Sequence, residues 1–217
     1  MSDYLDRSAD DAFGEPDGAS SRGYEYERGP APQPSADDAS PVNWYRLVEW
    51  LPRLGSVLWL HRTTGDAVFP RARLAEEGVL LLEHPALAAF SSCVKLQVFA
   101  AAGTHGPREW MEWIDANGDC AARMYLLPDT DHFAWDDMVA DCSITRAAPR
   151  TIARECMPRI FRWMRRSNQA QIVRFPLLRL PCLRVLGLRM PGELSALGRE
   201  IAAAIVRDEA VTMPMRI

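Results

Sequence analysis

The sequence predicts an α+β fold in which an antiparallel β-sheet, arranged as a meander, is flanked by helices. The main observation is the stretch Cys93–Tyr125, whose pattern is typical of three strands joined by two tight turns. Two amphipathic segments, Trp44–Leu51 and Glu193–Arg207, supply helices before and after it in the sequence. Strands in one run, with helices kept outside the run, form the α+β class.

The meander is inferred from alternation and from its turns. Residues 94–98 alternate between apolar and polar side chains, the period-two pattern of a half-buried strand. Gly103–Pro107 interrupts the chain, because glycine allows positive φ and proline cannot donate to a β-ladder. Trp110–Ile114 resumes the extended pattern, and residues 117–118 (Asn-Gly) form the strongest hairpin signal, since both tolerate positive φ. Ala121–Leu127 supplies the third strand.

Shorter elements precede the meander. Asn43 is expected to cap the first helix. Ser56–Arg62 is strand-like, and a tight turn leads it into Ala67–Phe69. Val79–Leu82 is a further apolar run, and Ala86–Ser92 is either a helical turn or a short strand. The buried stripe expected for the first helix is Trp44, Leu47, Val48 and Leu51.

Three further segments follow the meander. A short helix is expected around Trp135–Ala140, preceded by Asp131 or His132, and another helix over Pro149–Arg166. Residues 172–190 contain arginines spaced five residues apart, which matches neither a helix nor a strand period. We therefore expect irregular or short extended structure there. The buried stripe expected for the last helix is Leu194, Leu197, Ile201 and Ile205.

Composition divides the chain into three regions. Residues 1–40 are rich in Asp, Ser, Gly and Pro and poor in aliphatic residues, so we expect a disordered acidic leader. Residues 41–142 form the α+β sheet module, and residues 143–217 form an arginine-rich extension with helices that packs on the same domain. The net charge of −4 hides an asymmetry, since residues 143–190 hold eleven arginines and one acid, Glu155.

The cysteines and the apolar segments indicate the compartment. Five widely spaced cysteines without a Cys-x-x-Cys pair are typical of reduced thiols in a cytosolic protein. No N-terminal segment combines a basic start with an apolar run, as a secretory signal does. No apolar stretch approaches the roughly 20 residues that span a bilayer. We therefore expect a soluble, cytoplasmic protein.

The residues that could carry chemistry make no independent case for an enzyme. None of the four histidines stands three or four residues from another, so a helix-borne metal pair is excluded. The short motifs of hydrolases, P-loop proteins and dinucleotide-binding proteins are absent. Asp136, Asp137 and Asp141 are either a catalytic group or, as we favour, the solvated face of a short helix.

The regularly spaced arginines are the clearest electrostatic feature. Guanidinium groups pair bidentately with carboxylates and phosphates, so their partner is an anionic ligand, nucleic acid or the acidic leader. An acidic remainder and the lack of a recognisable reading module argue against nucleic acid. Alternatively, the arginines only surround a packed apolar segment, with their charged ends in solvent. The regularly spaced arginines are Arg174, Arg179, Arg184 and Arg189.

The meander and its surroundings resemble the haem-utilisation family, bacterial cytoplasmic proteins that carry haem or degrade haemin. The match needs no gap from Val98 to Trp135, and the resemblance covers roughly residues 44–139. The matching segments are Val98, Trp110–Gly118, Ala121–Tyr125 and Trp135, with Leu54–Leu58 and Gly65–Val68 as the preceding strand pair.

The resemblance implies an intracellular protein that binds and carries haem, or a similar anionic tetrapyrrole, in haem-iron utilisation. It also implies a homodimer, since family members often pair through their sheets. Haem degradation, the other activity of the family, leaves the question of an enzyme open. The alternative, from a different class, is a non-catalytic regulatory or protein-interaction module that kept the fold and lost haem binding.

Haem requires an axial donor, an apolar slot and cations for two propionates. Residues 68–70 (Val-Phe-Pro) occupy the position of the family's axial histidine, so the best substitutes as iron ligands are His61 and His84. The expected apolar wall is Trp59, Trp110 and Trp113, and the expected propionate partners are Arg174, Arg179 and Arg184.

Overall fold

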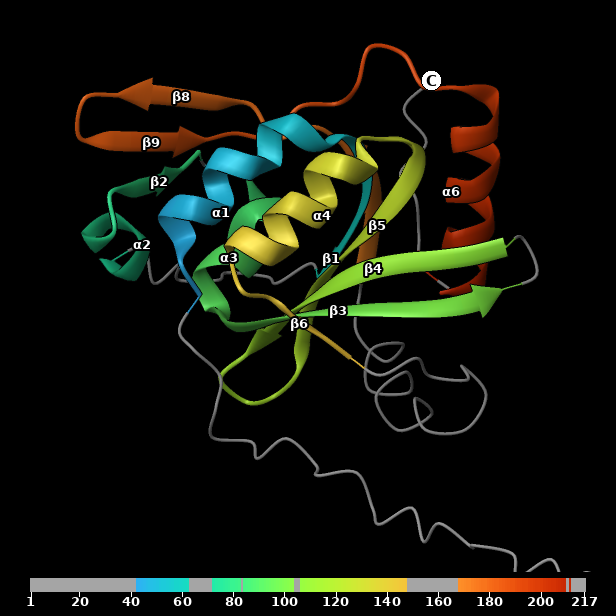
Figure 1. Ribbon diagram of the computed structural model, residues 1–217, viewed down its shortest axis with the longest axis horizontal. Helices are drawn as coiled ribbons and strands as arrows, with labels where there is room; N and C mark the ends of the chain where they lie inside the picture. Colours follow the sequence, from blue (N-terminus) through green and yellow to red (C-terminus); the bar gives the residue numbers. More distant parts are fainter. Residues whose placement is uncertain are drawn as a thin grey trace, which may run out of the picture. The chain divides into compact units, whose positions relative to one another are not determined.

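The computed structural model describes residues 42–62, 72–82, 84–103, 106–147, 168–209 and 211. The expected leader, the strand at Ala67–Phe69 and the helix at Pro149–Arg166 lie outside these residues. The described chain forms two β-sheets with helices packed against them, which confirms the α+β class (Figure 1). Each sheet contains one parallel pair of strands, so both are mixed rather than purely antiparallel.

The larger sheet, sheet A, has six strands in the order β6-β3-β4-β5-β1-β7. The three expected strands of the meander are confirmed as β3, β4 and β5. The arginine-rich extension contributes β7, which pairs with β1. The strands are β1 (Gly55–Arg62), β3 (Cys93–Gly103), β4 (Gly106–Asp115), β5 (Cys120–Thr130), β6 (Thr145–Arg146) and β7 (Asn168–Val173).

The turn between β4 and β5 is built around Asp115. Its Oδ1 accepts hydrogen bonds from the backbone N–H groups of Asn117 and Asp119, both at 2.9 Å. Gly118 has a φ of 75°, whereas Asn117 does not adopt positive φ. The hairpin is therefore where the Asn-Gly pair predicts it, but the turn is a longer loop than the two-residue type.

Helices begin at the expected caps. Oδ1 of Asn43 accepts from the N–H of Arg46, and Oδ1 of Asp131 accepts from the N–H of Ala134, both at 3.0 Å. Among the described helices, none combines the length and the apolar character that crossing a bilayer requires. The helices are α1 (Trp44–Trp50), η1 (Leu51–Leu54), α2 (Ala72–Glu76), η2 (Pro85–Leu87), α3 (Ala88–Ser92), α4 (His132–Asp141) and α6 (Ala196–Asp208).

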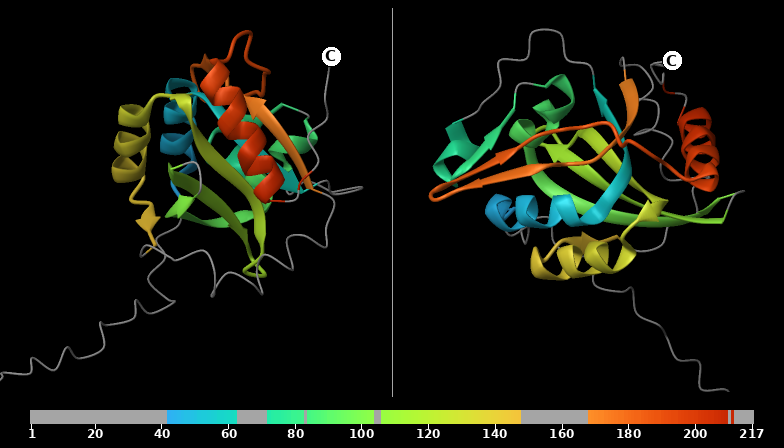
Figure 2. Two further views of the ribbon diagram at one scale, coloured as in Figure 1. Left: turned by 90° about the vertical axis from the view of Figure 1, so that its right-hand side faces the viewer. Right: turned by 90° about the horizontal axis from the view of Figure 1, so that it is seen from above.

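Helices cover both faces of sheet A (Figures 1 and 2). On one face, α1, α3 and α4 enclose the main core, where Trp59 and Trp113 pack against Phe90 and Phe175. On the other face, α6 covers a smaller apolar cluster that includes Leu58. Strand β1 is consequently buried on both sides over its whole middle part.

The smaller sheet, sheet B, has the strand order β2-β9-β8. Strands β8 and β9 form an antiparallel hairpin around residues 181–182, and β2 pairs in parallel with β9. The segment expected to be irregular or short and extended is therefore a pair of short strands. The strands are β2 (Val79–Leu81), β8 (Leu177–Leu180) and β9 (Leu183–Leu186).

The buried face of α6 differs from the predicted stripe. Leu197 is 55% exposed and Gly198 is buried in its place, whereas Ile205 is buried as predicted. A Cβ on Gly198 would lie 1.9 Å from Oδ2 of Asp129. The same carboxylate accepts from the N–H and the hydroxyl of Ser195, at 2.9 and 2.8 Å. Because α6 approaches β5 this closely, its first turn needs a small residue on the inner face, and the leucine turns outward.

A buried ion cluster holds the C-terminal end of α6 on sheet A. Nη1 of Arg123 lies 2.5 Å from Oε2 of Glu209, and its Nε lies 3.1 Å from Oε1 of Glu112. The hydroxyl of Tyr125 donates to Oε1 of Glu209. Burial raises the pKa of the Tyr125 phenol, and the charge of Glu209 raises it further, so the hydroxyl keeps its proton as a donor.

We predict that Glu209→Ala lowers the free energy of unfolding by about 2–4 kcal/mol, because it leaves Arg123 buried with one carboxylate fewer. Asp136→Ala is the matched control. The side chains of Asp136 and of its partner Arg146 are 65% and 47% exposed, so its loss should cost less than about 1 kcal/mol. Urea unfolding followed by circular dichroism measures both variants. Equal losses would contradict the role of the ion cluster.

Candidate functional site

His61 is buried near the end of β1, on the same face of sheet A as Trp59. Its Nδ1 lies 3.2 Å from the carbonyl oxygen of Arg62, which can only accept a hydrogen bond. This contact assigns the proton to Nδ1 and leaves the lone pair on Nε2. Nε2 is buried and has no hydrogen-bond partner among the described residues. An imidazole in this state has its Nε2 available as a metal ligand.

His84 shows the opposite hydrogen-bonding pattern. Its Nδ1 accepts from the backbone N–H of Ala86 at 3.2 Å and thereby caps the short helix η2. The lone pair of Nδ1 is used in this bond, so the proton resides on Nε2. The ring is half-buried, in contrast to that of His61. In this arrangement His84 is a helix cap and a hydrogen-bond donor.

The fold brings these two sequence-selected histidines within electrostatic reach of each other. Burial lowers the pKa of His61; the hydrogen bond to Arg62 opposes this shift, and the nearby His84 adds to it. Burial also lowers the pKa of His84. Both rings are therefore neutral at neutral pH, which is the protonation state that a metal ligand requires.

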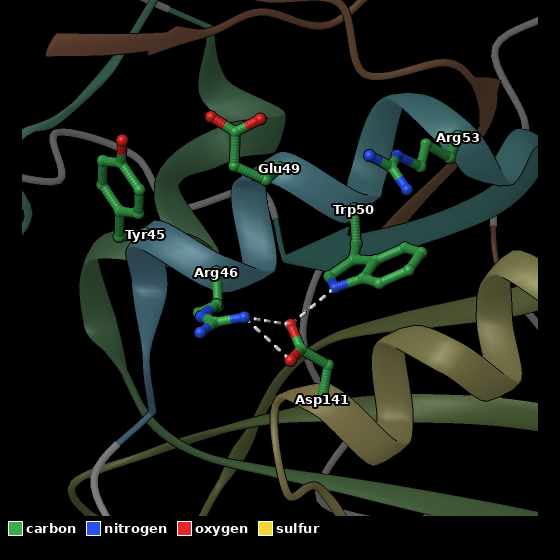
Figure 3. Close-up of a pocket in the computed structure, with 6 residues that line it drawn as sticks. All are labelled: Tyr45, Arg46, Glu49, Trp50, Arg53 and Asp141. Atoms are coloured by element: carbon green, nitrogen blue, oxygen red, sulfur yellow. Dashed lines mark hydrogen bonds and ion pairs between the residues drawn. The ribbon is translucent and has the colours of Figure 1, made fainter.

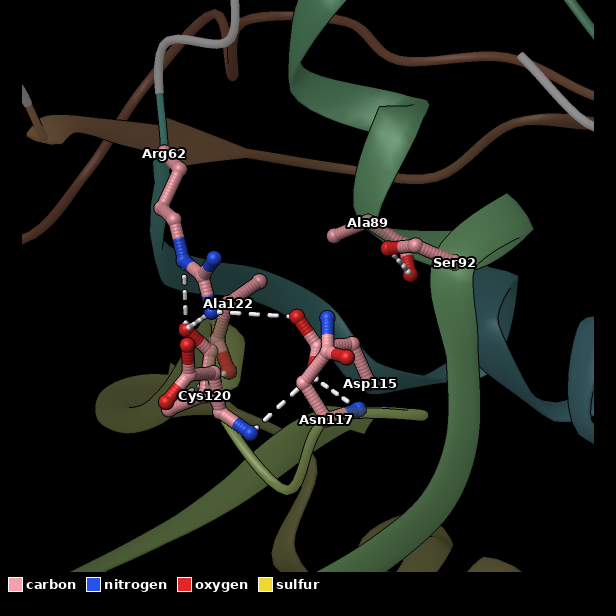
Figure 4. A network of polar contacts seen from close by, with 8 residues as sticks. Arg62, Ala89, Ser92, Asp115, Asn117, Cys120 and Ala122 are labelled. Atoms are coloured by element: carbon pink, nitrogen blue, oxygen red, sulfur yellow. Dashed lines mark hydrogen bonds and ion pairs between the residues drawn. The ribbon is translucent and has the colours of Figure 1, made fainter.

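A polar network anchors the end of β1 that carries His61 (Figure 4). Nε of Arg62 donates to the carbonyl oxygen of Cys120 at 2.7 Å, and its Nη2 lies 3.4 Å from Oδ2 of Asp115. Both partners flank the turn between β4 and β5. Burial raises the pKa of the Cys120 thiol far above its ordinary value, so this thiol stays protonated. The network therefore acts by fixing the backbone next to His61.

The three tryptophans expected to form one wall lie in two places. Trp59 and Trp113 are fully buried on the face covered by α1, α3 and α4, with ring centroids 4.7 Å apart. Trp110 lies on the opposite face, where its ring stacks on those of Phe99 and Tyr125. Residues 110 and 113 are an odd number apart on one strand, so their side chains project to opposite faces.

The predicted arginines divide between two partners. Nε of Arg179 lies 2.8 Å from Oε2 of Glu49 on α1, and Arg184 donates to Oε1 of the same carboxylate. The hydrogen bond from Arg179 contributes most to lowering the pKa of Glu49. We call Arg179 and Arg184 the inner arginine pair. Arg174 lies apart from them, with its Nε 3.1 Å from the hydroxyl oxygen of Ser56.

A pocket of about 430 Å³ lies beside Glu49, on the outward side of α1 (Figure 3). The inward stripe of this helix is buried, as the sequence predicts. The pocket is formed by the opposite side of the helix together with α4, and only the fold brings these two elements together. The sequence pattern that could have indicated this pocket is the helical spacing of its aromatic and charged lining residues. The lining residues are Tyr45, Arg46, Glu49, Trp50, Arg53 and Asp141.

Most charges in this pocket neutralise one another. Nη1 of Arg46 lies 2.9 Å from Oδ1 of Asp141, and Nε1–H of Trp50 donates to Oδ2 at 2.9 Å (Figure 3). The bond from Trp50, followed by the charge of Arg46, lowers the pKa of Asp141. The guanidinium of Arg53 stacks 4.6 Å from the Trp50 ring centroid. With the inner arginine pair at Glu49, arginines outnumber carboxylates here, which favours anions.

No group of three or more His, Cys, Asp or Glu side chains that could hold a metal ion occurs within the described part of the chain. Among the buried side-chain atoms of the described residues that lack a hydrogen-bond partner, Nε2 of His61 is the imidazole nitrogen. Such a site suits a metal ion whose other coordination positions are filled by a separate molecule.

The sequence matches no protein-family model and no curated protein. Holo-PhuS, a heme-binding protein from Pseudomonas aeruginosa, is 16% identical over 59% of this chain and 44% of its own, with a TM-score of 0.28. ChuS, a heme degrading enzyme of Escherichia coli O157:H7, is 16% identical over 60% of this chain and 43% of its own, also with a TM-score of 0.28. The chain thus spans less than half the length of either protein. At this level of similarity neither the ligand nor the activity of these proteins is transferred to it.

We predict that the protein loses stability as pH falls below 6.5, the ordinary pKa of histidine. The pKa of His61 is lowered in the folded state, so below this pH the unfolded chain binds more protons, and unfolding becomes more favourable. Urea unfolding of wild type and His61→Gln between about pH 7.5 and 5.5 tests this. The variant should show the shallower dependence on pH. Identical slopes would contradict the burial of a neutral imidazole.

Proposed function

We propose that this protein binds haem, or a similar tetrapyrrole, with His61 as the axial ligand. The hydrogen-bonding state of the His61 imidazole is the observation that supports this best. Nδ1–H of His61 is bonded to a backbone carbonyl, and Nε2 is buried without a partner among the described residues. A buried polar atom without a partner costs about 1–3 kcal/mol, so its retention calls for an explanation. Coordination of a haem iron satisfies it.

The surroundings of His61 fit the other requirements of haem. The porphyrin brings four nitrogen ligands, so one imidazole suffices. Trp59 and Trp113 lie on the same side of sheet A as His61 and belong to the buried core beside which a haem would pack. His84, the second candidate ligand, is half-buried and within electrostatic reach of His61. Bound haem would supply a redox-active iron, and the protein's part is to ligate and enclose it.

We favour a carrier of haem in cytoplasmic haem-iron utilisation over an enzyme that degrades it. A carrier needs an axial ligand and cations for the propionates; His61 is the candidate ligand, and Arg179 and Arg184, which bind Glu49 in this structure, are the candidate cations. The homodimer implied by the family resemblance remains part of this proposal.

A second candidate function is a non-catalytic interaction module that kept the fold without haem. The observation in its favour is the closure of the aromatic core. Trp59 and Trp113 have no exposed surface, and both rings also contact Phe90. Their faces are already used by the protein itself, so a haem would have to lie beside this cluster and not within it.

The experiment that separates the two functions is a titration of the purified protein with haemin, followed in the Soret region. We expect a saturable shift at one haem per chain, which His61→Gly abolishes because the imidazole is lost. Added imidazole should restore the shift in His61→Gly, since it can occupy the space left by the side chain. His84→Ala should weaken binding without abolishing it.

His132→Ala is the matched control, because His132 is an exposed histidine at the start of α4. It should titrate like wild type. A protein that is folded by circular dichroism but shows no saturable shift would refute haem binding and favour the interaction module. A shift that His84→Ala abolishes and His61→Gly does not would assign the ligand to His84.

The inner arginine pair gives a separate prediction. If Arg179 and Arg184 bind the propionates, the carboxylate of Glu49 competes with them. The double change Arg179→Gln/Arg184→Gln should then weaken haemin binding about tenfold, and Glu49→Gln should strengthen it. Arg174→Gln tests the third arginine alone. Arg199→Gln, on α6 and bonded to a carbonyl of its own segment, is the control. Unchanged affinity in both pair variants would remove the pair from the site.

A further inference from the structure

The outward face of sheet B is apolar across all three strands. Leu80 of β2, Val185 of β9 and Leu178 of β8 are register neighbours and form one row. Leu180 and Leu183 form the next row. Leu80, Leu178 and Leu180 are 39%, 59% and 41% exposed. We call the surface formed by these five residues, together with Leu82, the outer face.

Leu82 extends the outer face beyond the end of β2. Its N–H donates to the carbonyl oxygen of Leu186 at 2.9 Å, which continues the ladder. A Cβ on Gly187 would lie 3.0 Å from Cδ1 of Leu82 and 3.3 Å from Cγ of Pro176. These three residues therefore form a third apolar row, in which Leu82 is 55% exposed.

The charged residues of sheet B point toward the protein. The inner arginine pair, Arg179 and Arg184, is a register pair that binds Glu49 on α1. The two faces of sheet B thus differ: the inner arginine pair lies on the face that meets α1, where the side chain of Arg179 is still 53% exposed, and the exposed leucines lie on the opposite face. A sheet with one face in solvent normally presents its polar side chains there. A contiguous exposed apolar surface of this kind indicates contact with another molecule.

Helices cover every other sheet face in the described part of the chain (Figures 1 and 2). Helices α1, α3 and α4 cover one face of sheet A, and α6 covers the other. Helix α1 also lies against the inner face of sheet B, through the bonds from the inner arginine pair to Glu49. None of the described helices lies on the outer face.

Two further arginines close one end of the outer face. Arg174 and Arg189 form an antiparallel bridge in which each backbone N–H donates to the other's carbonyl oxygen, at 2.8 and 2.9 Å. Residues opposed in this way project their side chains to the same side of the sheet. Both are exposed and neither pairs with a carboxylate of any described residue; Nε of Arg174 donates to the hydroxyl oxygen of Ser56, which leaves its Nη groups for an anion. Like charges directly opposite each other destabilise a sheet, so this end favours an anion.

We propose that the outer face binds one amphipathic α-helix of a partner protein, with its apolar side on the leucines and a carboxylate at Arg174 and Arg189. Three strands spaced by about 4.8 Å span about 10 Å, the diameter of one helix. Six residues separate Arg174 from Leu180, or about 20 Å, which corresponds to about 13 residues of helix.

The size and charge of the outer face favour a single helix over a second copy of the chain. Four half-exposed leucines offer on the order of a few hundred Å². A stable dimer buries about 800 Å² on each partner. A second copy of this face would also bring arginines, and no carboxylate, to Arg174 and Arg189.

The test uses two synthetic helical peptides of about 14 residues with the same leucine side. One carries two glutamates at one end and the other carries two lysines there. Fluorescence anisotropy with the full chain should show saturable binding of the glutamate peptide, about tenfold tighter than that of the lysine peptide. The double change Arg174→Glu/Arg189→Glu should reverse this preference, a result that a folding defect cannot produce.

Leu178→Ser should weaken binding of the glutamate peptide about tenfold. Leu197→Ser, a leucine of similar exposure on α6, should leave it unchanged. The proposal is overturned if neither peptide saturates, if both bind equally, or if the two serine variants behave alike. A wild-type dimer in light scattering that Leu178→Ser turns into a monomer would also overturn it, because a second copy would then cover the outer face.

Discussion

The packing of Trp59 is the interaction on which the rest of the structure depends. Its ring centroid lies 4.7 Å from that of Trp113 in β4, 5.5 Å from Phe90 in α3 and 5.6 Å from Phe175. Its Nε1–H donates to the carbonyl oxygen of Ala86 at 2.8 Å. One side chain thus joins β1, the meander, the helical turn before it and the segment between the two sheets. Large buried aromatic rings dominate core energetics, which makes this contact the centre of the domain.

The same contact positions both histidines. His61 follows Trp59 by two residues and so projects from the same face of β1. His84 caps the helical turn whose Ala86 carbonyl accepts the hydrogen bond from Trp59. The indole of Trp59 therefore holds the backbone next to both His61 and His84. Their different hydrogen-bond partners, a carbonyl for His61 and an N–H for His84, give them opposite tautomers and different capacities to bind iron.

The five-residue spacing of the arginines is explained by the hairpin that contains them. The turn lies midway in the series, so the hairpin places Arg179 opposite Arg184 and Arg174 opposite Arg189. An odd spacing along a strand alternates the faces, which directs the first pair inward and the second pair outward. The inward pair attaches sheet B to Glu49 of α1, and Leu178 and Leu180, which project from the opposite face, are exposed to solvent.

Local features of this protein could be predicted from its sequence, because they depend on neighbours within one turn or one strand. The caps at Asn43 and Asp131 and the strands of the meander belong to this group. The family resemblance also singled out His61 and His84 as candidate ligands, although their tautomers follow from backbone contacts that only the structure defines. The tertiary structure alone decided which surfaces meet: it placed Asp129 against α6 and thereby changed the helix face that is buried. The tertiary structure likewise brought the inner arginine pair to α1, and it brought α1 and α4 together around the pocket. Such contacts depend on packing between distant segments, which no local pattern encodes.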